Sequence, residues 1–118
     1  MEIKVNDDSR FVVFSVKGRL DFASSTQLKE EILKFIRQGR TTSILNLAQV
    51  DFINSSGLGT LVSILKEVRL VRGRLVLSNL ATYVQEIFDI TQLSHIFEIF
   101  ASEAEAREAL AGTPEKVR

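Results

Sequence analysis

One stretch constrains the fold of this chain most. It consists of a short apolar run, a turn of small polar residues and an amphipathic run, in that order. Residues 44–47 form a mostly apolar run, interrupted by Asn46, and predict a buried strand, whereas residues 58–71 show helical periodicity. The turn Asn54-Ser55-Ser56-Gly57 lies where that helix would begin. A helix start carries free backbone N–H groups and the positive end of the helix dipole, which suit an anion. We therefore expect a strand–turn–helix unit that presents an exposed serine switch.

Two glycines, Gly57 and Gly59, fall in the first turn of this expected helix. Each glycine costs about 1 kcal/mol of helix stability relative to alanine. A sequence that keeps both indicates that another group comes close to the backbone there. We interpret them as structural residues that let the helix start and let a partner approach.

The rest of the chain alternates between strand-like and helix-like segments. Residues 2–5 and 11–16, joined by a turn, predict an antiparallel hairpin. A first helix is predicted to open with the capping box Ser24-x-x-Gln27 and to stop at Gly39. The remaining predictions are strands at 42–47, 74–78 and 96–100, an end of the 58–71 helix at Arg72-Gly73, a short helix around 83–88, and a last helix over 104–110 behind the capping box Ser102-x-x-Glu105.

This alternation predicts one α/β domain over residues 1–112, followed by a frayed tail at 113–118. We expect a mixed sheet of about five strands, antiparallel in the first hairpin and parallel afterwards, packed with about four helices. In such sheets, binding sites gather at the carboxyl ends of the strands. Asp21 and the pair Asn54-Ser55 each follow a strand, so we expect them at one rim of the sheet.

Composition narrows the classes of function. The 15 basic and 15 acidic residues cancel, which argues against a broad contact with nucleic acid or an anionic membrane. The chain has no cysteine and one histidine, His95, so neither a metal site nor a cofactor is expected. No apolar run reaches the roughly 20 residues of a membrane helix, and no signal peptide is visible. A cytoplasmic domain is the expectation.

Common catalytic and nucleotide-binding motifs are not matched. Ile53 and Asn54 precede Ser55, so the Gly-x-Ser-x-Gly elbow of hydrolases is missing. No lysine follows the glycines as it does in a P-loop, and residues 57–62 lack the third glycine of a dinucleotide fingerprint. We therefore expect no catalytic residues and a protein that is not an enzyme.

Residues 51–59 read Asp51-Phe52-Ile53-Asn54-Ser55-Ser56-Gly57-Leu58-Gly59, and here the chain resembles the STAS domain, the family of bacterial anti-sigma-factor antagonists. Gly18-Arg19-Leu20-Asp21 is similar to the family's Gly-x-Leu-Asp before its first helix, and Leu45-Asn46-Leu47 is similar to the strand before its switch. The length and the element order match over essentially the whole chain. The family commonly has Asp before the phosphorylated serine, whereas this chain has Asn54, which caps a helix without adding charge.

The resemblance implies a partner switch. The unphosphorylated antagonist binds an anti-sigma factor and so frees a sigma factor that activates transcription. The anti-sigma factor is usually also an ATP-dependent serine kinase, which phosphorylates the first serine of the motif, here Ser55. A metal-dependent serine phosphatase then resets the switch. The residues implied in partner binding are Asp21, Asn54, Ser55, Ser56, Gly57 and Leu58.

Three other interpretations are open at this point. Ser55 or Ser56 could act only as the N-cap of the helix. The domain could be a scaffold or a stress-complex subunit that never meets such a kinase. A response-regulator receiver phosphorylated on Asp51 is the third, although the acidic pair Asp7-Asp8 precedes a strand instead of a helix and residues 100–102 lack a lysine.

Overall fold

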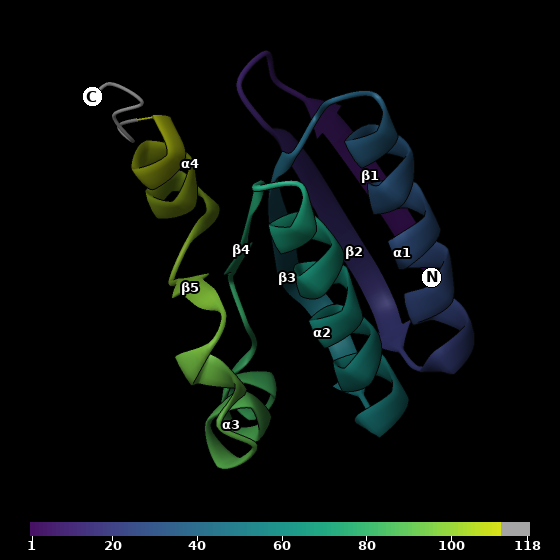
Figure 1. The fold of residues 1–118 in the computed structure, drawn as a ribbon. Helices are drawn as coiled ribbons and strands as arrows, with labels where there is room; N and C mark the ends of the chain where they lie inside the picture. The colour runs from purple at the N-terminus through teal and green to yellow at the C-terminus, as the bar shows by residue number, and fades with distance from the viewer. Residues whose placement is uncertain (112–118) are drawn as a thin grey trace.

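The computed structural model describes residues 1–111, which build one five-stranded sheet with helices on both of its faces (Figure 1). The strands are β1 (Glu2–Asp7), β2 (Val12–Leu20), β3 (Thr42–Ile53), β4 (Arg74–Ser78) and β5 (Glu98–Phe100). The helices are α1 (Phe22–Arg37), α2 (Ser55–Leu70), α3 (Thr82–Ile90) and α4 (Glu103–Ala111), with a 3-10 turn η1 (Leu93–His95) before β5. The end of the domain expected at residue 112 and the frayed tail expected at 113–118 lie outside the described residues.

The strands lie in the sheet in their chain order, β1-β2-β3-β4-β5. β1 runs antiparallel to β2, and each following pair is parallel. The predicted mixed α/β sheet with an N-terminal hairpin is thus confirmed. The order excludes the receiver interpretation, because the doubly wound sheet of receivers has the order 2-1-3-4-5, in which the first strand lies inside the sheet.

The apolar residues form two clusters on opposite faces of the sheet. Side chains of α1, α2 and α3 pack against one face, where Phe14 and Leu45 lie at the centre of the larger cluster. Successive strand residues point to opposite faces, so their neighbours Val13 and Ile44 belong to the smaller cluster, which Ala106 of α4 covers. The larger cluster also fixes the two helices, α1 and α2, that flank the predicted switch.

Helix α1 begins earlier than the sequence predicted. Its N-cap is Asp21, whose Oδ1 accepts the N–H of Ser24 at 3.1 Å. The Ser24 hydroxyl oxygen in turn accepts the N–H of Asp21 at 3.0 Å, which completes a capping box. The predicted box Ser24-x-x-Gln27 is therefore wrong: Ser24 is the third helical residue, and Asp21 is the cap because it directly follows the last residue of β2.

Of the other predicted element boundaries, several helix boundaries are confirmed and the end of β3 is wrong. The ends of α1 at Gly39 and of α2 at Arg72-Gly73 are confirmed, and the Ser102 hydroxyl oxygen caps α4 by accepting the N–H of Glu105 at 3.1 Å. The prediction that β3 ends at residue 47 is wrong, because the strand continues to Ile53 by pairing with β2. The ladder between β3 and β4 stops at Asn46, so the last part of β3 extends past β4.

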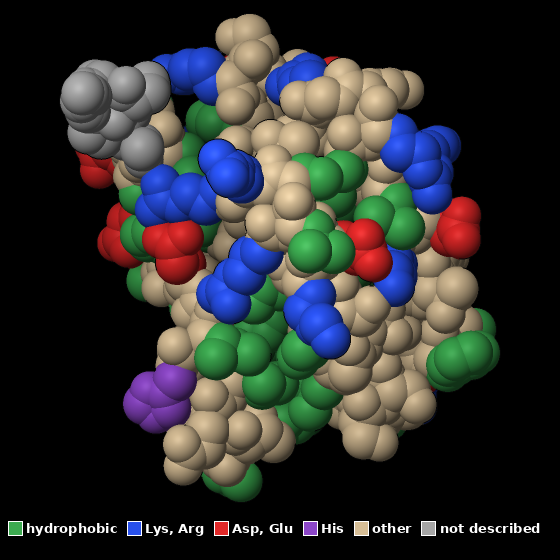
Figure 2. All heavy atoms as spheres, viewed as in Figure 1, with side chains coloured by type: hydrophobic (Ala, Val, Ile, Leu, Met, Phe, Trp, Pro, Cys, Tyr) green, Lys and Arg blue, Asp and Glu red, His purple; other side chains and the backbone are tan. Residues whose placement is uncertain are grey.

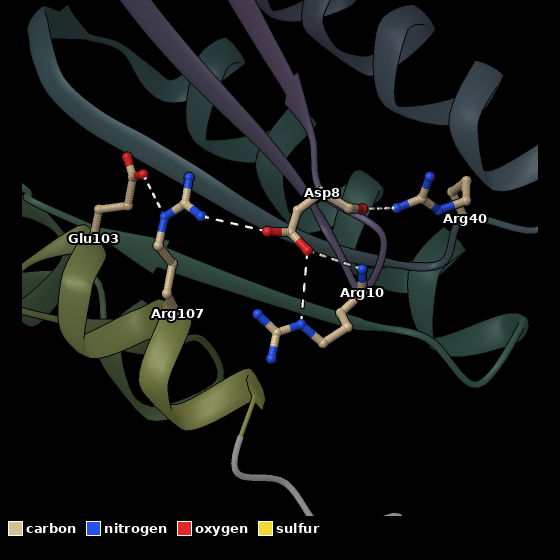
Figure 3. A network of polar contacts seen from close by, with 5 residues as sticks. All are labelled: Asp8, Arg10, Arg40, Glu103 and Arg107. Carbon is tan, nitrogen blue, oxygen red and sulfur yellow. Dashed lines mark hydrogen bonds and ion pairs between the residues drawn. The ribbon is translucent and has the colours of Figure 1, made fainter.

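An ionic network around Asp8 ties the hairpin turn to α4 (Figure 3). The Asp8 carboxylate accepts the N–H of Arg10 at 3.1 Å and lies 3.8 Å from the Arg107 guanidinium of α4. Arg107 also pairs with Glu103 at 2.8 Å, and Arg40 donates to the Asp8 carbonyl oxygen. The hydrogen bond from the Arg10 N–H, followed by the charges of Arg10 and Arg107, holds the pKa of Asp8 below its ordinary value.

Acid should weaken this network. Because the pKa of Asp8 is lowered by folding, its charge stabilises the folded state above the ordinary value near 4, and that stabilisation is lost as the pH falls through the folded-state pKa. We expect the melting temperature to fall from about pH 5 downwards, and to fall less steeply in Asp8→Asn. Asp51→Asn, at an exposed position, is the matched control. Equal slopes in Asp8→Asn and the unaltered protein would contradict this account.

Candidate functional site

The turn after β3 is capped by Asn54. Its side-chain oxygen accepts the N–H of Gly57 at 2.9 Å, and α2 begins at Ser55. Ser55 and Ser56 are the first two helical residues, and both are exposed. The interpretation of Ser55 or Ser56 as the N-cap is therefore wrong. Since Asn54 fills the capping role, both hydroxyls face solvent at the positive end of α2.

Asp21 occupies the equivalent position one strand away. Leu20 and Ile53 pair at the ends of β2 and β3, so Asp21 and Asn54 follow neighbouring strands at one rim, as predicted. Hydrogen bonds from the backbone N–H and then the hydroxyl of Ser24 lower the pKa of the Asp21 carboxyl. The rim thus presents two helix starts, one capped by a carboxylate and the other by a neutral amide.

Gly57 holds the start of α2 against the end of β2. A Cβ at Gly57 would lie 2.2 Å from the carbonyl oxygen of Leu20, which is much shorter than the 3.0 Å below which Cβ contacts essentially never occur. The same oxygen accepts the N–H of Asn54 at 3.3 Å. At Gly59, a Cβ would meet nothing within 4 Å. The fold itself therefore requires Gly57, whereas Gly59 leaves the helix backbone open to the outside.

A groove of about 540 Å³ lies between α1 and α2, next to residues 54–57, the turn predicted to act as the switch and called the switch turn below. Ser56 and Gly59 line it from α2, and Phe22, which is 71% exposed, lines it from α1. Figure 2 shows this helix-covered face, on which basic side chains are spread out and apolar side chains surface between α2 and the segment from β4 to α3. Sequence reasoning missed Phe22; the available signal was a large apolar residue directly behind the Asp21 cap.

The predicted partner-binding residues differ in their exposure. Ser55 and Ser56 are exposed, Asp21, Asn54 and Leu58 are half-buried, and Gly57 is buried. Leu58 also packs against the larger core cluster. Within residues 1–111, no group of three His, Asp or Glu side chains could share a metal ion, and no helix has the length and apolar character needed to cross a membrane.

The family model for the STAS domain matches residues 1–106 of the chain. This chain belongs to the STAS family. The family identification made from residues 51–59 is thus confirmed, and the match extends from the N-terminal hairpin into α4. The sequence of the anti-sigma-B factor antagonist of Bacillus subtilis is 32% identical over 101 residues, which cover 86% of this chain and 90% of that protein.

Two solved structures of the Bacillus protein SpoIIAA are also similar. The structure of this anti-sigma factor antagonist in its unphosphorylated form has a TM-score of 0.75 at 28% identity and covers 94% of this STAS chain and 99% of SpoIIAA. The phosphorylated form has a TM-score of 0.73 at 28% identity, with coverage of 92% and 99%. The STAS fold of this chain is therefore shared with a protein that exists in both phosphorylation states.

Proposed function

We propose that this STAS protein is an anti-sigma-factor antagonist controlled by phosphorylation of Ser55. In its unphosphorylated form it binds an anti-sigma factor in the bacterial cytoplasm, and the released sigma factor activates transcription. The observation that carries this proposal is the exposed Ser55 hydroxyl at the first position of α2, with the helix already capped by Asn54. Similarity to antagonists of anti-sigma factors along nearly the whole chain supports it.

A phosphate on Ser55 is compatible with the folded domain. It adds about −1.5 to −2 charges at a helix N-terminus, where backbone N–H groups and the helix dipole favour negative charge. The first turn of α2 contains no acidic residue that would repel the phosphate, and the N-cap residue Asn54 is neutral. We therefore expect the modified domain to keep its fold.

The same phosphate disrupts a protein–protein interface. At a contact surface the added charge must be desolvated or must face like charge. A thousandfold loss of affinity corresponds to about 4 kcal/mol, which one badly placed dianion can supply. The switch therefore acts through the partner's affinity, without any refolding of the antagonist.

The proposal assigns complementary roles to two enzymes. The anti-sigma factor is an ATP-dependent serine kinase that modifies Ser55, and a metal-dependent serine phosphatase restores the hydroxyl. The antagonist itself is a substrate and a binder. Asp21, Ser56 and Leu58 act as partner contacts together with Ser55, and Asn54 and Gly57 shape the turn at which α2 begins.

The function is tested by binding in the absence and presence of ATP. A candidate anti-sigma-factor kinase from the same organism is purified and mixed with the immobilised antagonist. We expect retention without ATP and release once ATP is added, whereas a Ser55→Ala variant stays bound under both conditions. A complex that persists equally with ATP in the unaltered protein, after Ser55 has been modified, would contradict the proposed switch.

A further inference from the structure

Tyr83, in the first turn of α3, reaches the end of β3. The backbone N–H of Ile53 donates to its phenol oxygen at 2.9 Å. Ile53 is the last residue of β3 and directly precedes the Asn54 cap of α2. A side chain far along the chain therefore holds the peptide from which the switch turn begins.

The Tyr83 hydroxyl pairs with the N–H of Ile53 on the side of β3 where the described part of the chain provides no neighbouring strand. β3 pairs with β4 only between Thr42 and Asn46, and within residues 1–111 no other strand continues that edge. Ile53 is 5% exposed, so an unpartnered N–H at this place would lose water without gaining another acceptor. The Tyr83 oxygen supplies the acceptor that a carbonyl of β4 would otherwise provide.

On the opposite side of the turn, the hydrogen bond to β2 is longer. There, the N–H of Asn54 donates to the carbonyl oxygen of Leu20 at 3.3 Å, a long distance for such a bond. The bond from Ile53 to Tyr83 is shorter, at 2.9 Å, and comes from a different helix. The placement of the Asn54 cap, and of Ser55 behind it, thus depends on α3 as well as on β2.

We propose that Tyr83 is a positioning residue for the switch, whose phenol oxygen fixes the last peptide of β3 and thereby the presentation of Ser55 to the kinase. The role of Ser55 in this statement rests on the proposed function. The action is indirect, because the contact of Tyr83 is with the backbone of Ile53 and not with the serine hydroxyl.

The structural part is tested by amide hydrogen exchange in Tyr83→Phe, followed by NMR. This variant keeps the ring and removes only the acceptor. We expect the protection of the Ile53 amide to fall by about tenfold or more, with faster exchange in the turn that follows. Thr82→Val removes a neighbouring exposed hydroxyl from the same helical turn. It should change neither the protection of the Ile53 amide nor the exchange rates in the following turn. An unchanged Ile53 exchange rate in Tyr83→Phe would overturn the proposal.

The functional part is tested by phosphorylation kinetics with the purified kinase. In Tyr83→Phe, the misplaced Ser55 hydroxyl should be phosphorylated with a kcat about tenfold lower, while KM stays within about twofold. A raised KM with unchanged kcat would instead make Tyr83 a direct partner contact and would overturn the positioning role. If the unaltered protein is not phosphorylated at all, the proposed function fails, whereas the exchange experiment still decides whether Tyr83 holds the turn.

Discussion

Replacing Gly57 with alanine should destabilise the domain by about 2–3 kcal/mol, because the new methyl group overlaps the Leu20 carbonyl oxygen. An added Cβ would lie 2.2 Å from that oxygen, which belongs to the backbone and has no flexible side chain to move aside. Either α2 shifts away from β2 or the strand end distorts. The expected fall in melting temperature is about 10 °C, measured by thermal and urea unfolding.

Gly59→Ala is the matched control for this substitution. It makes the same chemical change on the same helix, at a position where a Cβ meets nothing within 4 Å. Because alanine favours the helix more than glycine does, this variant should gain about 0.5–1 kcal/mol. Equal effects of the two substitutions would contradict the assignment of Gly57 as the contact between α2 and β2.

The Ser55→Asp variant should lose at least about a hundredfold in affinity for the anti-sigma factor, or about 2.7 kcal/mol, because a fixed negative charge then lies in the proposed interface. Its melting temperature should stay the same or rise slightly, since an acidic side chain at a helix N-terminus is favourable. Titration calorimetry gives the affinity, and circular dichroism gives the stability.

The control for this variant is Ser9→Asp. It adds the same charge at an exposed position in the hairpin turn, which lies at the other end of β2 from the Asp21 rim. We expect its affinity to be unchanged, so that any loss in Ser55→Asp is local and not an effect of net charge. Full binding by Ser55→Asp would place the interface away from the start of α2.

The sequence was sufficient to predict the fold and the position of the switch turn, because local patterns decide both. The apolar run at 44–47 and the periodicity after Leu58 predict a strand followed by a helix, with the turn at Asn54 between them. The extension of β3 to Ile53 was not predictable in this way, since polar residues such as Gln49 interrupt the apolar run. That segment is a strand because it pairs with β2, which is a tertiary effect.

The missed features of the site have the same origin. Asp21 and Ser24 both have side chains able to cap a helix, and the choice of Asp21 follows from where β2 ends. Phe22 and Tyr83 contribute through neighbours that are distant in sequence, namely the groove wall on α2 and the N–H of Ile53. Sequence periodicity does not report such contacts, because they form only in the folded chain.

The central claim is that Ser55 is the phosphorylated residue, and mass spectrometry of the protein after reaction with its kinase and ATP tests it most directly. We expect one phosphate, located on Ser55, and none on a Ser55→Ala variant that binds the kinase normally. A phosphate located on Ser56 or Thr60, with Ser55 unmodified, would contradict the account.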